Sequence, residues 1–482
     1  MCRKGGVTVY LSLVLLVLLS MVAAALQSAR LAACRAAISS GVEQGLYSLF
    51  AQYDRDLYER FGLLMIDGGY GSSALSLGQL LAETEEDIAC VLCPDSGGAG
   101  GRDILRMQIT GRSVEGYLLA TDQSGAAFRR QICALSQAGD GEEAVRILQG
   151  RLEGEKRQMD DLLQLRARYS EGDAALYYAE DHPELAFAGE EDAGAEEVAV
   201  PEGFVNPLEQ IDQLRGRLLT SLVLPGGGAL SAAAVSPGEL VSGRHLNRGL
   251  GLAPPAAGAA GEKYRLLAYM TDMFACFTDQ HTGPGLRYQI EYAIGRQPAD
   301  EANLREVLQR LMTMREAANM TYLMTSEARR AEASRMAAII AAVMLRPDLE
   351  PAVSFALKAA WAYGESLADL RTLLRGGRVP LAKSDQTWQL PLQALAWIGQ
   401  DAAGSGSAEG LDYREYLCLL LLTQSGDSLA DALMDLTEHV MRTEMGRPAF
   451  RLDVCVAAVE LAFDVRAGRQ TWHIGRSYAY DP

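Results

Sequence analysis

One stretch near the start of the chain constrains its fold more than any other. Residues 7–26, VTVYLSLVLLVLLSMVAAAL, contain no charged side chain. A helix of this length rises roughly 30 Å, which is the hydrocarbon thickness of a bilayer. Its few hydroxyl groups can bond to carbonyls of the same helix, so they do not keep it out of lipid. The sequence therefore predicts a transmembrane helix over residues 7–26, after a basic leader over residues 1–6.

One alternative is a secretion signal that is removed, because Ala23-Ala24-Ala25 has the small residues of a cleavage site. The apolar core of a signal peptide is usually only about 7–15 residues long, which favours a retained anchor. Arg3 and Lys4 lie on the short flank, and basic flanks stay in the cytoplasm. We therefore expect a cell-membrane protein with a cytoplasmic N-terminus and the bulk of the chain extracytoplasmic.

Apolar residues continue at steps of three or four beyond the membrane segment. They are Leu31, Cys34, Ile38, Val42, Leu46, Leu49, Tyr53 and Leu57. This spacing predicts an amphipathic helix over residues 27–66 that continues from the membrane and ends near Gly62. Its apolar face has two candidate partners, the body of the same protein, which we favour, or copies of the same helix.

Composition divides the rest of the chain into four regions. They are a helical region with loops over 67–179, an acidic and Gly/Ala/Pro-rich linker region with one helix over 180–262, a helical domain over 263–447, and a C-terminal β-hairpin or sheet over 448–482. In the last region apolar residues alternate, and the phase slips between Val456 and Leu461, which predicts a bulge. The expected fold class is mainly α with a small C-terminal antiparallel β element (α+β).

Charge and cysteine usage limit the function. The net charge of −18 opposes binding to phosphate backbones and to anionic lipid head groups, so nucleic acid is not an expected partner. Cys90 and Cys93 are the only closely spaced cysteines, and they favour a local disulfide or two inert thiols over redox or metal chemistry. Nine acids within residues 180–202 indicate a solvated linker, and a calcium site is the alternative.

No catalytic motif is visible in the sequence. It contains no G-x-S-x-G elbow, no H-E-x-x-H helix and no G-x-x-x-x-G-K-[ST] loop, and its five histidines are scattered. We therefore expect no enzyme activity, no catalytic residues, no cofactor and no metal. The enzyme alternative is a membrane-tethered cell-wall hydrolase, which needs two carboxyl groups in a cleft, one with a raised pKa. A cell-surface binding or adhesion module is a third hypothesis.

Two sets of residues carry a resemblance to a known group. The leader and apolar helix RKGGVTVYLSLVLLVLLS and the stretch YDRDLYERFGLLMID resemble the TadE/TadG-like pseudopilins of the Tad pilus, and related uncharacterised membrane-anchored proteins of Gram-positive anaerobes. The C-terminal stretches KYRLLAYMTDMFACFTD and GGRVPLAKSDQTWQL also resemble members of that wider group.

The resemblance implies a bacterial cell-surface protein of pilus assembly. Its partners would be the lipid bilayer and other pilin-like helices or Tad platform proteins. In pilin-type leaders a peptidase cuts after a glycine, here Gly5 or Gly6, and the fifth residue after the cut is glutamate. Counted from Val7, that position is Leu11, which favours anchoring without cleavage.

Overall fold

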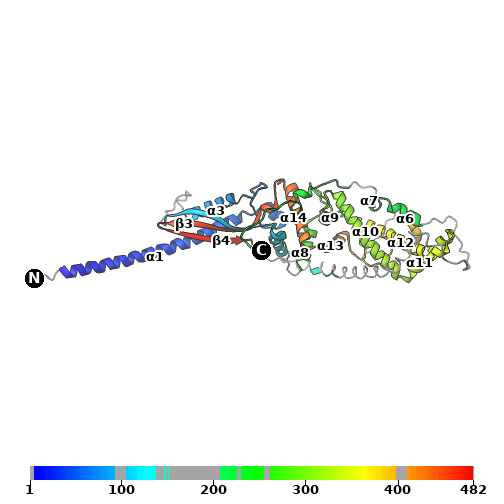
Figure 1. Cartoon of the computed structure of the whole chain (residues 1–482), viewed down its shortest axis with the longest axis horizontal. Coiled ribbons are helices and arrows are strands. Elements are labelled where there is room, and N and C mark those ends of the chain that lie inside the picture. The colour runs from blue at the N-terminus through cyan, green and yellow to red at the C-terminus, as the bar shows by residue number, and fades with distance from the viewer. Residues whose placement is uncertain are drawn as a thin grey trace. The chain divides into compact units, whose positions relative to one another are not determined.

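The computed structural model describes residues 5–92, 105–136, 207–224, 230–254, 261–397 and 410–480, with the single residues 146, 147, 150 and 153. The chain forms two compact units, each assembled from segments distant in sequence. Unit 1 contains residues 1–135, 243–259 and 437–482, and unit 2 contains residues 136–242 and 260–436. Among these residues helices dominate, and the sheet that they form is small and antiparallel, which confirms the predicted fold class (Figure 1).

Unit 1 combines a long N-terminal helix with the four strands of the described residues. Its elements are α1 (Gly5–Ala51), α2 (Arg55–Phe61), β1 (Ile66–Asp67), α3 (Leu77–Leu92), β2 (Met107–Leu119), α4 (Asp122–Leu135), the 3-10 helix η7 (Leu452–Val454), β3 (Cys455–Ala467) and β4 (Gln470–Ala479). Two of the four boundaries between the units fall inside helices, namely the 3-10 helix η4 (Val241–Gly243) and α14 (Gly426–Thr443).

The membrane-type segment and the amphipathic segment form one continuous helix, α1, as predicted. The helix ends earlier than expected, however, at Ala51. Asp54 starts a second helix, α2, because its Oδ1 accepts a hydrogen bond from Leu57 N at 3.0 Å. Gly62, with φ of 71°, ends α2 in the left-handed conformation that glycine adopts without strain.

The sheet of unit 1 is organised around β3. β2 pairs antiparallel along one edge of β3, and β1 and β4 pair antiparallel along the other. The pairing with β2 skips Ala457, which confirms a bulge between Val456 and Leu461. Gly468 and Arg469 form the turn between β3 and β4, so the predicted C-terminal hairpin is present. Residues 67–179 were expected to be helix and loops, but this region also contributes β2.

The core of unit 1 lies between α1, α3 and one face of the sheet. The buried α1 residues are Cys34, Ile38, Val42, Leu46, Leu49 and Phe50. They pack with Ile88 and Leu92 of α3 and with alternate residues of β3, such as Leu461 and Phe463. The apolar face of α1 after the membrane-type segment therefore packs on the protein's own body, the partner that the sequence analysis favoured.

Unit 2 is helical. Its elements are α6 (Pro207–Arg215), α7 (Leu219–Val223), η3 (Pro237–Glu239), α8 (Glu262–Met273), α9 (Gln289–Gly295), α10 (Asp300–Thr325), α11 (Glu327–Val343), η5 (Pro347–Leu349), α12 (Glu350–Leu374), η6 (Leu392–Trp397) and α13 (Tyr413–Leu422). α12 packs against α10 and α11, and α9 packs against α10 and α13. α12 carries the fully buried Trp361, so this stretch is a buried helix and not a second membrane span.

Candidate functional site

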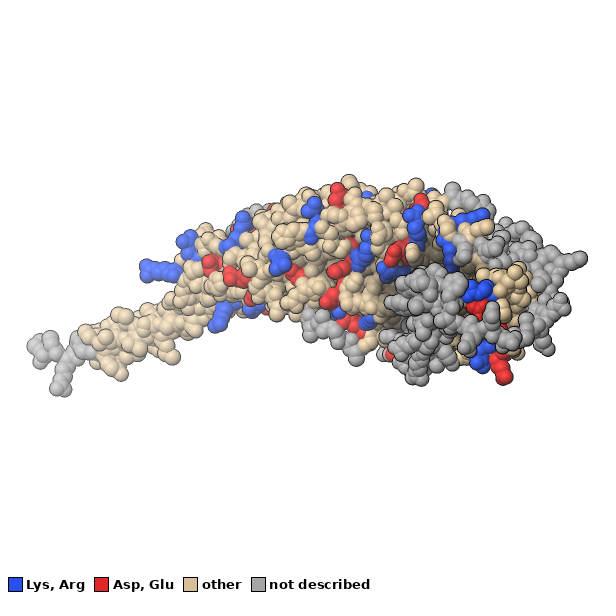
Figure 2. Space-filling model, turned by 45° about the vertical axis from the view of Figure 1, so that its right-hand side comes forward, with Lys and Arg blue, Asp and Glu red and all other residues tan. Residues whose placement is uncertain are grey.

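The first 25 residues of α1 form a charge-free rod that is exposed in the protein. Val7, Leu11 and Leu26 each keep about two-thirds of their side-chain surface accessible, at 66%, 66% and 67%. The hydroxyls of Ser12 and Ser20 donate to carbonyls three residues earlier, at 2.9 and 2.8 Å. Within the part of the chain that the structure describes, α1 is the one helix long and apolar enough to cross a membrane. Figure 2 shows this rod without a charged side chain.

The second half of α1 fixes the rod to unit 1 through close contact with α3. Gly41 lies against Leu92, and Gly45 lies against Ile88. A Cβ atom at Gly45 would be 2.4 Å from Ile88 Cγ1, so only glycine permits this spacing of the two helices. The rod is therefore a rigid extension of a packed helix and not a separate flexible leader.

The structure tests few of the site residues predicted from sequence. Gly5 and Gly6 lie in the first turn of α1, whereas Arg3 and Lys4 lie outside the described residues. Cys90 is exposed near the end of α3. Cys93 lies outside the described residues, so the disulfide remains a prediction. The acidic run 180–202, with its calcium alternative, also lies outside them.

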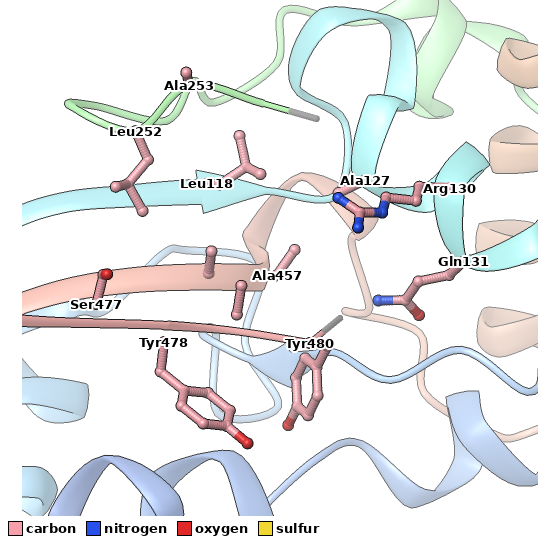
Figure 3. A pocket seen from close by; sticks show the side chains of 12 residues that line it. Leu118, Ala127, Arg130, Gln131, Leu252, Ala253, Ala457, Ser477, Tyr478 and Tyr480 are labelled. Atoms are coloured by element: carbon pink, nitrogen blue, oxygen red, sulfur yellow. The ribbon is translucent and has the colours of Figure 1, made fainter. Parts of the chain in front are cut away.

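Unit 1 contains a pocket of about 330 Å³ at the end of the sheet where β4 finishes. Figure 3 shows Arg130 and Gln131 reaching it from α4, Leu252 from the loop beside β2, and Tyr478 and Tyr480 from the end of the chain. Its complete lining is Leu118, Ala127, Arg130, Gln131, Leu252, Ala253, Ala457, Ala458, Ser477, Tyr478, Ala479 and Tyr480. None of the described residues that line this pocket is a carboxylate, so the pocket gives the hydrolase hypothesis no support.

Two arginines tie the end of the chain to the rest of unit 1, and the sequence analysis did not identify them. Arg447 Nη2 lies 2.6 Å from Asp67 Oδ2, and Arg447 also pairs with the helix-capping Asp54. Arg244 Nη1 lies 2.6 Å from the buried Glu438, in the C-terminal part of α14. These pairs join segments that lie more than 190 residues apart in sequence, and they stabilise the unit.

Unit 2 buries a network of four charged side chains. Lys383 Nζ lies 2.6 Å from Glu365 Oε1 and 2.6 Å from Asp369 Oδ1. Arg315 Nη2 lies 2.9 Å from Asp369 Oδ2, and all four side chains are fully buried. Burial raises the pKa of Glu365. Burial would also raise the pKa of Asp369, but Arg315 and Lys383 hold it below its ordinary value.

Glu291 is a second buried acid of unit 2. Its Oε1 accepts hydrogen bonds from Phe277 N at 2.7 Å and from the Tyr413 hydroxyl at 2.9 Å. Burial raises the pKa of Glu291 to about 7. This value suits a general acid, but the side chain has no exposed surface, and its described partners are structural. The arrangement gives the hydrolase hypothesis no support.

The described residues contain no group of three His, Cys, Asp or Glu side chains that could hold a metal ion. The chain was also compared with known proteins. The model of one family, a family of unknown function (DUF5702), matches residues 197–467, which is more than half of the chain. The matched range excludes α1. No curated protein and no solved structure matches the chain.

Proposed function

Because the chain belongs to DUF5702, a family of unknown function, its own structure must supply the argument, and we propose that it is a single-pass membrane-anchored assembly protein. In this proposal the bulk of the chain is extracytoplasmic. The protein acts as a minor pseudopilin-like component of a Tad-like pilus or secretion system.

One observation carries the proposal, namely the division of α1 into two halves. The charge-free half is exposed, and the hydroxyls of Ser12 and Ser20 are satisfied within the helix, as lipid requires. The other half packs on an antiparallel sheet of its own unit. A lipid-facing rod that continues into a packed helix is what the resemblance to pilin-type proteins leads us to expect. Such rods associate in lipid by close packing of small residues.

The orientation rests on the leader. Arg3 and Lys4 precede the rod, and basic residues on a short flank favour the cytoplasmic side, although Arg30 and Arg35 follow the rod and reduce the contrast between its two flanks. The body that follows is acidic and long, and long domains cross the membrane largely regardless of their charge.

Fractionation and cysteine labelling test placement together. We expect the full chain to stay in the membrane pellet after a carbonate wash. An R55C variant places a thiol at an exposed position of α2. A membrane-impermeant maleimide should label R55C in intact cells above the wild-type background. Recovery of the wild-type chain in the soluble fraction, or labelling of R55C only after lysis, would contradict the proposal.

A photo-crosslinking residue at Leu15 tests the assembly role. Leu15 is exposed in the rod, and we expect crosslinks to other pilin-like helices or platform proteins. The same residue at the exposed Tyr47, in the packed half of α1, serves as the matched control. Crosslinks confined to lipid at Leu15 would leave a membrane anchor without the assembly role.

A further inference from the structure

Five arginines lie at the end of unit 1 from which the charge-free rod emerges. They are Arg30, Arg35, Arg106, Arg466 and Arg469, and all five are exposed. On the face shown in Figure 2, several blue side chains lie close to the base of the rod, with red side chains next to them. We propose that this basic collar binds the phosphate head groups of anionic phospholipids in the leaflet where the rod leaves the bilayer. The inference rests on the proposed function, because it needs the rod to be in lipid.

Hydrogen bonds and strand pairing bring the collar together from three parts of the chain. Arg30 Nη2 donates to Leu105 O at 3.1 Å, which places the residue before Arg106 beside the end of the rod. At the start of β2, Gln108 pairs with Arg466, and Arg466 Nη2 donates to Gln108 Oε1 at 3.0 Å. Arg469 lies in the turn that follows β3.

The level of the collar along α1 follows from a second set of contacts. Arg476 of β4 reaches Ser39 Oγ at 2.8 Å and Glu43 Oε1 at 3.2 Å, so it is level with about residue 41 of α1. The turn at Arg469 is seven residues away, or roughly 23 Å of strand, which equals about 15 residues of helix. The turn is therefore level with about residue 26, where the rod reaches the head-group layer.

Few described acids offset the charge of the collar. Asp464 is the nearest acid on β3, and its Oδ1 lies 2.9 Å from His473 Nδ1; Glu43 pairs with Arg476. Glu85 of α3 pairs with Arg112. Arg35 and Arg469 make no ion pair or side-chain hydrogen bond within the described residues. The collar is thus locally basic in a chain whose net charge is −18.

This placement favours a lipid partner. Basic side chains next to a membrane segment are attracted by anionic head groups over about a Debye length, and the rod holds the collar within that distance. Trp472 lies partly buried close to the same turn, and tryptophan is enriched at membrane interfaces. A soluble anion has no apolar part that could contact the adjacent rod, so the rod would not strengthen its binding.

Fluorescence quenching in vesicles tests the collar. The full chain is reconstituted into phosphatidylcholine vesicles that contain either brominated phosphatidylcholine or brominated phosphatidylglycerol. The emission of Trp472 is obtained by subtracting the W472F spectrum. We expect stronger quenching by the phosphatidylglycerol, and the preference should fall about fivefold for each arginine removed. It should also fall in 1 M salt, where the Debye length is about 3 Å.

The double variant R35Q/R469Q removes two collar charges without breaking a described contact. Its matched control is R55Q/R248Q, which removes two exposed arginines that unit 1 carries near the other ends of α1 and β2. A preference that is lost in the first variant and kept in the second supports the collar. Equal quenching by the two lipids in the wild type, or equal loss in both variants, overturns it.

Flotation with vesicles of phosphatidylcholine alone separates the two proposals. These vesicles contain no anionic lipid, so insertion of the chain into them depends on the rod and not on the collar. A chain that inserts but shows no lipid preference overturns the collar and leaves the anchor intact. A chain that does not insert overturns the proposed function, and the collar with it.

Discussion

At the scale of single residues, Glu291 links the stability of unit 2 to pH. Burial raises its pKa from an ordinary value of 4.5 to about 7. Between these two values the folded protein binds a proton that the unfolded chain has lost. The free energy of unfolding should therefore fall as the pH rises from 4.5 to 7 and change little above that, as far as Glu291 is concerned.

We predict that E291Q removes this dependence. The glutamine oxygen can still accept from Phe277 N and from the Tyr413 hydroxyl, but the side chain cannot ionise. Urea unfolding of both proteins in the same detergent, followed by tryptophan emission, measures the effect. The stability of E291Q relative to wild type should rise by about 3 kcal/mol between pH 4.5 and pH 8. If the free energies of unfolding of the two proteins changed with pH in parallel, ionisation of Glu291 would not affect stability, and the prediction would be wrong.

The buried charges also show where sequence reasoning fails at this scale. Glu365 and Asp369 are four residues apart in the predicted helical domain, on the buried helix α12. Their partners Arg315 and Lys383 come from other parts of the chain. The spacing of residues in a sequence predicts which of them share a face of a helix. It does not predict which cationic side chain from a distant part of the chain will pack against that face.

At the scale of elements, the contact between α1 and α3 depends on glycine. We predict that G45A destabilises unit 1, because the added Cβ would lie 2.4 Å from Cγ1 of the fully buried Ile88. Overpacking of this kind typically costs about 1–3 kcal/mol. Thermal unfolding measured by circular dichroism compares the variants.

G78A is the matched control for this prediction. Gly78 lies in the first turn of α3, and an added Cβ there meets nothing within 4 Å. Alanine favours helix over glycine by up to about 1 kcal/mol, so G78A should be neutral or stabilising. If G45A were as stable as G78A, the two helices could not be as close as described.

The elements differ in how far the sequence predicted them. The steps of three and four in α1 predicted its buried face correctly at Cys34, Ile38, Val42, Leu46 and Leu49. The same steps continued through Tyr53 and Leu57, which hid the break at Asp54. β2 was missed because register shifts at two places interrupt its alternation, and because its partner β3 lies more than 300 residues later. The charge-free rod was found, since composition alone identifies it.

At the scale of the whole molecule, unit 1 depends on the end of the chain for its central strand. We predict that a chain truncated after Val454, which lacks β3 and β4, loses the packing of α1 and α3. Limited proteolysis should then cleave within residues 34–92, which the full chain protects. Trp361 and Trp388 belong to unit 2 and report separately whether that unit keeps its core. Continued protection of residues 34–92 would contradict the central place of β3.

The place of β3 in the chain also has a consequence for biosynthesis. Roughly 400 residues separate the end of α1 from the start of β3. At a translation rate of about 5–20 residues per second, the ribosome needs about 20–80 s to cover that distance. Throughout that interval the apolar face of α1 lacks the strand β3, which packs against it in the folded protein. Under the proposed function, the charge-free rod would therefore enter the bilayer before the ribosome has synthesised the central strand of unit 1.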